Sequence, residues 1–279
     1  MKILSNVPLK TKTTFRCGGT AKWFAKPEDF IEFETLLKLH KHKLFVLGGG
    51  SKTLCKDEGF DGLVISTKHL SKIFFEKDLV VCEAGVKFED LENFCIKNAL
   101  SGLEWSAGIP ASVGGACVMN AGAFGHDFSE SVEKVEVFFN GKKIILGKKD
   151  ITFSYRNSSL KNKVVFRVWL RLKKSTKQNV EEGYLRFGHE KQKNQPVCMG
   201  SAGSIFKRQE NVIPAKIIDK LGLKGVKIGG AEVSSHHSGF IVNKGTATAS
   251  DVLNLVEYVR KIVQQKTGIV LENELIVLE

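Results

Sequence analysis

Two glycine-rich stretches have the composition of a binding site for a phosphorylated ligand. Gly48-Gly49-Gly50-Ser51 directly follows a short apolar run, and residues 107–125 hold five Gly and five Ala. Backbone N–H groups without a neighbouring side chain can approach an anion closely, which suits a pyrophosphate. Two such loops fit the two ends of a dinucleotide. A tight turn, or backbone packed against backbone, would also select glycine.

The first stretch departs from the common nucleotide-binding motifs. Ser51 precedes Lys52, where a P-loop requires glycine, and Thr53 stands at the last glycine position of the G-x-G-x-x-G motif. These motifs are therefore excluded at this loop. The second stretch has too little side-chain bulk to build a core of its own, so a large flat ligand or another backbone is expected to lie against it.

Length and composition indicate a folded protein of about two domains. The chain has 279 residues, of which 42% are hydrophobic and 26% charged, which excludes disordered, collagen-like and solenoid classes. At roughly 150 residues per domain, each part is long enough to bury a core. No apolar run reaches signal-peptide or membrane-spanning length, so we expect a cytoplasmic protein without a membrane partner.

The net charge of +12 allows two interpretations. A basic surface can bind nucleic acid or attract small anionic ligands, while scattered lysines also occur on any solvated surface. No RRM, KH, zinc-finger or helix-turn-helix signature accompanies the charge, so we expect no nucleic-acid partner. The cysteines lack C-x-x-C and zinc-site spacing, so we expect reduced thiols and no metal site. They are Cys17, Cys55, Cys82, Cys95, Cys117 and Cys198.

Apolar periodicity places helices between strands, as in α/β and α+β proteins. The expected helices are residues 27–40, 88–99, 179–193, 213–221 and 250–265, and the expected strands are 44–47, 62–66, 79–83, 134–139, 164–172, 239–242 and 269–271. The polar, lysine-rich residues 173–179 are the expected linker. They separate a first domain, residues 1–172, from a second, residues 173–279.

Seven motifs, in order along essentially the whole chain, resemble the UDP-N-acetylenolpyruvoylglucosamine reductase family. They are VLGGGS (46–51), GIPASVGGACVMNAGAFG (108–125), SYRNS (154–158), SAGSIFKR (201–208), GLKGVKIGGAEVS (222–234), HHSGFIVN (236–243) and LENEL (271–275). The glycine loops alone would indicate only the wider vanillyl-alcohol-oxidase-type FAD fold. The GSIFK, LKG and LENEL elements are typical of the reductase.

The resemblance implies an α+β protein: a two-lobed FAD-binding fold of the vanillyl-alcohol-oxidase type, followed by a smaller α/β substrate-binding domain. The final segment is expected to return to the active site. The short span between Leu172 and Ser201 resembles the subclass that lacks an inserted capping loop. A cytoplasmic monomer acting in peptidoglycan precursor synthesis is implied.

The implied reaction is reduction of UDP-N-acetylglucosamine enolpyruvate by NADPH through non-covalently bound FAD. Hydride addition pushes charge into the substrate carboxylate, so an oxyanion must be stabilised and one proton supplied. By similarity, Ser204 is the proton donor, and Arg156 and Glu274 are the charged pair around the carboxylate. Glu274 is then expected to be protonated, or hydrogen-bonded to Arg156 or a water. Outside these motifs, a turn serine and a surface ion pair would explain the same residues.

The resemblance also assigns binding residues by position. Those expected at FAD are Gly48, Gly49, Gly50, Ser51, Gly108, Ser112, Gly114, Gly115, Asn120, Ala121 and Gly122, and those expected at the UDP-sugar are Tyr155, Lys207, Lys224 and His237. A rival function within flavin chemistry is an oxidase of the same broad fold. Many such oxidases attach FAD through a histidine in the first glycine loop, and here Ser51 follows Gly50.

Overall fold

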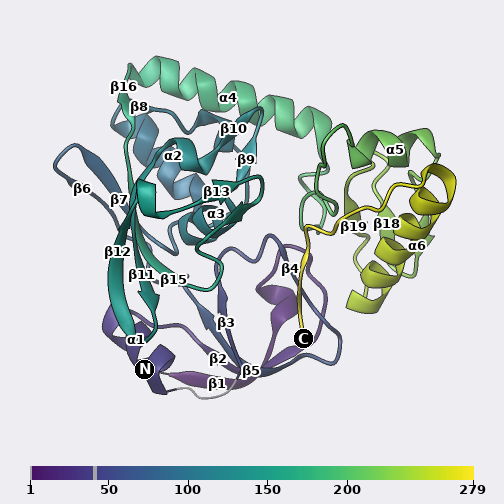
Figure 1. Cartoon of the computed structure of the whole chain (residues 1–279), viewed down its shortest axis with the longest axis horizontal. Helices are drawn as coiled ribbons and strands as arrows, with labels where there is room; N and C mark the ends of the chain where they lie inside the picture. Colours follow the sequence, from purple (N-terminus) through teal and green to yellow (C-terminus); the bar gives the residue numbers. More distant parts are fainter. Residues whose placement is uncertain (1, 40–42) are drawn as a thin grey trace. The chain divides into compact units, whose positions relative to one another are not determined.

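The computed structural model describes residues 2–39 and 43–279, and the chain packs into two compact units (Figure 1). Unit 1 consists of Met1–Leu4, Phe24–Gly49 and Leu63–Lys191, and unit 2 of Ser5–Trp23, Gly50–Gly62 and Gln192–Glu279. The chain passes between the units within β1 (Ile3–Pro8), β2 (Thr20–Ala25) and β5 (Phe60–Ser66), after Gly49, and near the end of α4 (Lys177–Asn194). Both units are therefore built from segments far apart in sequence.

An antiparallel sheet with strand order β12-β11-β15-β7-β6 forms the framework of unit 1 (Figure 1). The strands are β12 (Lys142–Gly147), β11 (Val132–Phe139), β15 (Val164–Leu170), β7 (Leu79–Glu83) and β6 (Ile73–Glu76). The apolar residues of β7 are all buried, as expected for a strand covered on both faces. Helices α2 (Phe88–Lys97) and α3 (Val113–Met119) contribute to the same core.

A parallel pair, β3 (Leu44–Leu47) and the end of β5, also belongs to unit 1. Helix α1 (Phe30–Leu39) precedes β3, and the Asp29 carboxylate accepts a hydrogen bond of 2.8 Å from the Glu32 N–H in its first turn. The predicted helix over residues 27–40 is therefore confirmed in its body, and its start is set by Asp29. His40, at its predicted end, lies outside the described residues.

Helix α4 lies against residues 104–108 of unit 1. A Cβ on Gly183 would come within 2.8 Å of the Glu104 side chain, and one on Gly188 would lie 3.9 Å from the Cβ of Ala107. Gly183 therefore lets this face of the helix approach closely, while Gly188 has room for an ordinary contact. The predicted linker at 173–179 is wrong, because β16 (Lys173–Lys174) pairs with β8 (Leu100–Ser101) and α4 begins at Lys177. A polar composition here reflects exposed faces of regular elements.

Unit 2 packs α6 (Ala249–Thr267) and α5 (Pro214–Lys220) with a small antiparallel sheet, β17 (Lys227–Ile228), β18 (Ala231–Val233) and β19 (Ile241–Asn243). A capping box between Thr248 and Asp251 begins α6, and Gly268, with φ +73°, ends it. The apolar face of α6 is buried in the core of the unit. No helix among residues 2–39 and 43–279 is long and apolar enough to cross a membrane.

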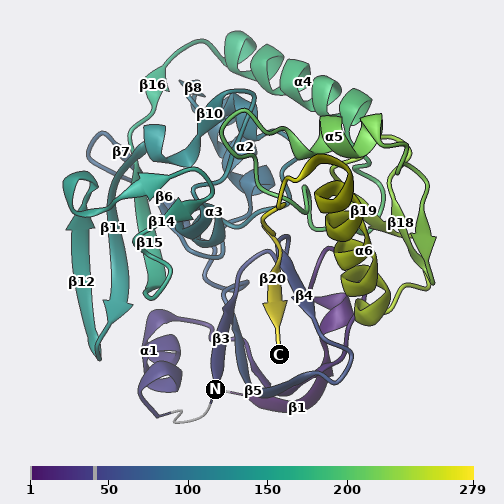
Figure 2. The same ribbon diagram turned by 45° about the vertical axis from the view of Figure 1, so that its right-hand side comes forward.

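The last strand, β20 (Ile276–Leu278), pairs in parallel with β4 (Thr53–Cys55) (Figure 2). The predicted strand at 269–271 is wrong: these residues are irregular, and Leu271 is buried in the core without a strand partner. An apolar pattern detects burial and cannot reveal a partner more than 200 residues away. The remaining short strands are β9 (Gly122–Ala123), β10 (His126–Asp127), β13 (Phe153–Ser154) and β14 (Asn157–Ser158).

Candidate active site

The two glycine-rich loops lie against each other within unit 1. A Cβ on Gly48 would come within 2.3 Å of the Ser112 Oγ, and one on Gly49 within 2.9 Å of the Pro110 carbonyl oxygen. Glycine at these two positions is therefore explained by loop-on-loop packing. Gly50, in unit 2, has φ +65° and lies against the Lys12 carbonyl, and Ser51 follows it in a turn. Binding of a phosphate by these backbone N–H groups stays a prediction.

Neighbouring glycines at the start of α3 differ sharply in their surroundings. Ser112 is the N-cap, and its Oγ accepts from the Gly115 N–H at 3.3 Å. A Cβ on Gly114 would lie 2.7 Å from the Cβ of Ala84, so this buried glycine is required by packing against β7's end. Gly115 is exposed, and a Cβ there would meet only the Ser112 Oγ, at 3.2 Å. The open side at Gly115 is where a ligand has room to approach.

Asn120 joins the second glycine loop to the SYRNS segment. It ends α3 in the left-handed conformation, with φ +42°. Its Nδ2 donates to the Ser154 carbonyl at 3.1 Å, and its Oδ1 accepts from the Ser129 N–H at 3.0 Å. The two bonds tie the buried Asn120 to segments 34 and 9 residues away, so it holds the loop that continues through Ala121 and Gly122 in place.

Arg156 projects from the turn between β13 and β14. Its φ of +52° is the left-handed conformation expected in a tight two-residue turn. Its Nη2 donates to the Gly122 carbonyl, and the guanidinium lies 4.7 Å above the ring of Tyr155. The structure thus brings together three predicted residues: a substrate residue, a catalytic residue and a residue of the glycine loop.

Lys191, which sequence reasoning missed, is also part of this region. It lies on α4 and is only 8% exposed, and its Cδ would be 3.4 Å from a Cβ on Gly108, a glycine with φ +65°. Burial, and secondarily the positive charge of Arg156, lowers the pKa of Lys191 to about 8. A lysine on a polar helix carries no sequence signal of burial. Phe187 and Gly188, four and three residues before Lys191, mark the helix face on which it lies.

Ser204 lies on a short extended segment of unit 2, between the segments that contain Phe240 and Glu274. It bridges Phe240 on one side, while the Ile205 carbonyl accepts from the Glu274 N–H at 2.7 Å on the other. The chain after α6 therefore runs beside the Ser204 segment, as the family resemblance implies for the final segment. The half-buried Ser204 hydroxyl makes no hydrogen bond with any residue that the structure describes.

An ion pair with the half-buried Lys52 joins the buried Glu274 to this segment. The Lys52 Nζ lies 2.8 Å from the Glu274 Oε1, and it donates to the carbonyls of Ser204 (2.6 Å) and Ala202 (3.2 Å). Glu274 is 6% exposed. The ion-pair partner of Glu274 is therefore Lys52, which the sequence motifs did not identify. Lys52 directly follows the first glycine-rich stretch, which does not fit the P-loop motif. A cation two residues after a glycine run is its local signal in the sequence.

The remaining predicted substrate residues lie at the surface of unit 2. Lys207 pairs with Glu272 at 3.4 Å, and Lys224 with Asp219 at 3.0 Å. Burial, followed by the charges of Lys224, His236 and Arg208, lowers the pKa of His237, whose Nδ1 accepts from the Gly239 N–H. The charge of Lys224 thus acts on His237, while Lys207 lies in a separate ion pair.

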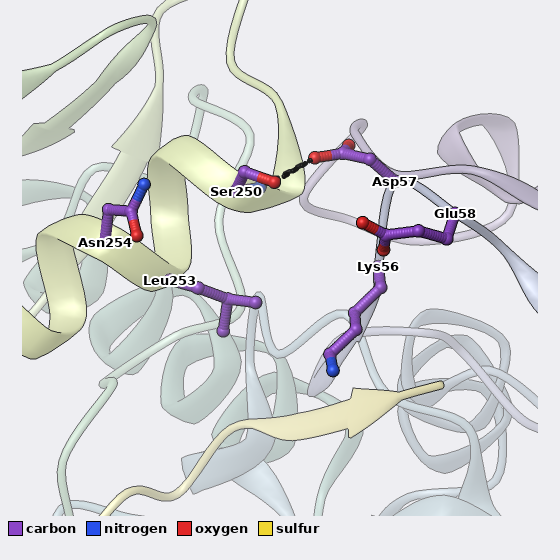
Figure 3. A pocket seen from close by; sticks show the side chains of 6 residues that line it. All are labelled: Lys56, Asp57, Glu58, Ser250, Leu253 and Asn254. Atoms are coloured by element: carbon purple, nitrogen blue, oxygen red, sulfur yellow. Dashed lines mark hydrogen bonds between the residues drawn. The ribbon is translucent and has the colours of Figure 1, made fainter.

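A shallow pocket elsewhere in unit 2 contains none of the predicted site residues. It is lined by Lys56, Asp57, Glu58, Ser250, Leu253 and Asn254 (Figure 3). The Asp57 carboxylate accepts from the N–H groups of Ala249 and Ser250, both at 2.8 Å, and from the Ser250 hydroxyl at 2.7 Å. These bonds cap the start of α6, so Asp57 has a structural role.

Comparisons with known proteins agree with this arrangement along nearly the whole chain. Residues 23–145 match the FAD binding domain family, and residues 195–278 match the family described as UDP-N-acetylenolpyruvoylglucosamine reductase, C-terminal domain. The reductase of that name from Caldanaerobacter subterraneus subsp. tengcongensis is 38% identical, over 98% of this chain and 93% of its own. The Thermotoga maritima one is 40% identical over 95% of both chains.

The chain belongs to the UDP-N-acetylenolpyruvoylglucosamine reductase family. The crystal structure of UDP-N-acetylenolpyruvylglucosamine reductase from Thermus caldophilus superposes with a TM-score of 0.86 at 34% identity, and the match covers 100% of both chains. The chain is therefore an FAD-containing oxidoreductase with the expected α+β fold. The predicted division at Leu172 differs from both the compact units and the family matches, and it stays a prediction.

The residues of unit 1 fit FAD as a ligand. The side of Gly115 that would carry a Cβ is open, and the buried side chain of Lys191 lies with its Cδ beside Gly108 of the same glycine-rich segment. A phosphorylated cofactor needs both close backbone approach and positive charge. The residues that would hold it are those of the second loop, from Gly108 to Gly122.

Proposed function

We propose that this protein reduces UDP-N-acetylglucosamine enolpyruvate to UDP-N-acetylmuramate with NADPH as the hydride donor, in peptidoglycan precursor synthesis. The supporting observation is identity of 38–40% to named reductases over at least 95% of the chain. The FAD binding domain and the reductase C-terminal domain match successive parts of the same polypeptide. When bound, FAD supplies hydride transfer between NADPH and the substrate.

In unit 1, Arg156 is proposed to neutralise the charge that grows on the substrate carboxylate. Hydride arriving at the terminal carbon of the enolpyruvyl group pushes an electron pair toward the carboxylate, which gives an enolate. A guanidinium matches a carboxylate in bidentate geometry, and its benefit is largest when the charge is most developed. The bond to Gly122 and the Tyr155 ring support this role, because they limit the directions in which the guanidinium can point.

In unit 2, Ser204 is proposed to donate the proton to the carbon beside the carboxylate. A hydroxyl is a weak acid, so it can act only when it is held in position and when the acceptor is strongly basic. Lys52 supports the first condition, because its ammonium holds the Ser204 carbonyl at 2.6 Å. Glu274 is proposed to act as a carboxylate paired with Lys52, so that its negative charge is balanced and does not repel the enolate.

Binding of the UDP-sugar is assigned to Tyr155 in unit 1 and to Lys207, Lys224 and His237 in unit 2. Lys224 and His237 have the better support, because charges that lower the pKa of His237 would also attract a diphosphate. We further propose that the protein acts as a cytoplasmic monomer.

One rapid-mixing experiment tests the function. The purified yellow protein is bleached anaerobically with NADPH and then mixed with UDP-N-acetylglucosamine enolpyruvate. We expect flavin absorbance to return at the rate at which UDP-N-acetylmuramate appears in the mass spectrum. Absorbance that returns with oxygen but not with this substrate would exclude the proposed reaction and leave an oxidase.

A further inference from the structure

We propose that Lys191 binds an oxyanion of a ligand that lies on the second glycine loop, either the enolpyruvyl carboxylate or the pyrophosphate of FAD. The inference rests on the proposed function for the identity of these ligands. It goes beyond that function because neither the sequence motifs nor the family resemblance assigns any role to Lys191.

The first argument is the way in which α4 buries Lys191. Gly183 lets the helix approach Glu104, Gly188 lies against Ala107, and Lys191, about one turn further on, is then carried against Gly108. Phe187, on the same face, lies with its ring centroid 5.0 Å from that of Phe124, near the other end of the glycine-rich segment. Glycine and aromatic contacts therefore bring this face of α4 onto the loop, and Lys191 with it.

The second argument is charge. Lys191 is 8% exposed, and it forms no hydrogen bond or ion pair with any residue in the described part of the chain. The charged group that acts on it is Arg156, which is positive as well. A buried cation without a protein partner is costly unless an anion of a ligand joins it. Arg156 is the proposed partner of the substrate carboxylate, so the same carboxylate, or a pyrophosphate on the loop, is the anion that the pair would hold.

The third argument is the pKa of Lys191, which at about 8 keeps the ammonium largely protonated at neutral pH. The residue is thus available as a cation when a ligand arrives. An anion close to the ammonium would raise this pKa again and strengthen the contact. Lysine also suits a site that must accept more than one geometry, since its ammonium is a point charge with three rotatable donors.

Lys191→Met removes the charge and keeps most of the side-chain volume. Lys193→Met, at an exposed position two residues further along α4, is the matched control. FAD content is read from the absorbance ratio of the purified proteins. Each oxidised, FAD-loaded protein is then titrated with the enolpyruvyl substrate, and separately with UDP-N-acetylglucosamine, which lacks the carboxylate, while the flavin spectrum is followed.

If the anion is the carboxylate, Lys191→Met should keep FAD and bind the enolpyruvyl substrate about tenfold or more weakly. Its affinity for UDP-N-acetylglucosamine should be unchanged. If the anion is the pyrophosphate, the variant should lose FAD, and Lys191→Arg should recover it. Wild-type FAD content with unchanged affinity for both ligands, or equal weakening of both, would overturn the proposal. The wild-type protein is assayed for reduction of the same substrate in parallel. If it reduces the substrate while Lys191→Met shows one of these results, the proposal for Lys191 fails and the proposed function stands.

Discussion

Two lysines, one in each unit, contrast in how their charges are satisfied. Lys52 in unit 2 is paired with Glu274 and donates to two carbonyls. Lys191 in unit 1 is more enclosed than Lys52, lies beside a glycine-rich loop and is influenced by Arg156, a second cation. The protein balances the first charge itself and leaves the second for a ligand. A buried cation thus marks a binding site only where the surrounding protein does not neutralise it.

The largest expected effect comes from changing Ser204, whose segment is held in place by the Lys52 contacts. Ser204→Ala should be bleached by NADPH at a near-normal rate, because this half of the reaction needs no proton from Ser204. Reoxidation by the enolpyruvyl substrate should slow by about a thousandfold or more, because the enolate returns to substrate unless it is protonated. Stopped-flow absorbance at the flavin band reads both steps. Equal slowing of the two halves would reduce Ser204 to a residue that shapes the site.

Lys52→Met should have the next largest effect, and it should lower both the free energy of unfolding and the rate of reoxidation by substrate. The variant leaves the buried Glu274 carboxylate without its partner, which costs about 3 kcal/mol in free energy of unfolding. Thermal unfolding of the apoprotein measures this. Reoxidation by substrate should slow more than bleaching by NADPH, because the Ser204 segment loses its anchor.

Lys52→Arg is the control for that prediction, since it keeps the charge and should restore most of the stability. Lys191→Met should shift the melting temperature in the opposite direction to Lys52→Met, because it removes a charge without a protein partner. Destabilisation of the same sign and size by both methionine variants would contradict the contrast between the two lysines.

The sequence predicted the elements of this fold better than the contacts that complete the site. The bounds of β3 and β7 and the bodies of α1, α2 and α6 follow from local apolar periodicity. The β20–β4 pairing and the Lys52–Glu274 ion pair each join residues more than 200 positions apart, so no local pattern contains them. The burial of Lys191 likewise depends on which face of α4 meets residues 104–108.

The glycine loop offers a smaller effect that separates packing from ligand binding. Gly114→Ala places a Cβ 2.7 Å from the Cβ of Ala84, so it should cost about 1–3 kcal/mol in the apoprotein. Gly115→Ala meets only a serine hydroxyl and should leave apoprotein stability nearly unchanged. Gly115→Val should lower FAD content without lowering the apoprotein melting temperature. Full FAD content in that variant would place the cofactor away from Gly115.

The smallest expected effect is the pH dependence of the Lys191 contribution to stability. Its pKa falls from 10.5 to about 8 on folding, so the unfolded chain binds more protons between these values. The free energy of unfolding therefore rises with pH in this window. The destabilisation that Lys191 causes reaches its full size only below about pH 8. Lys191→Met should be more stable than wild type at pH 7, and the difference should shrink by about 1 kcal/mol at pH 9. Urea unfolding of both apoproteins at the two pH values measures it. Arg156 is the charged group that acts on Lys191 among the described residues. A difference that is constant with pH would mean that Lys191 is not buried as a cation, and would remove the contrast with Lys52.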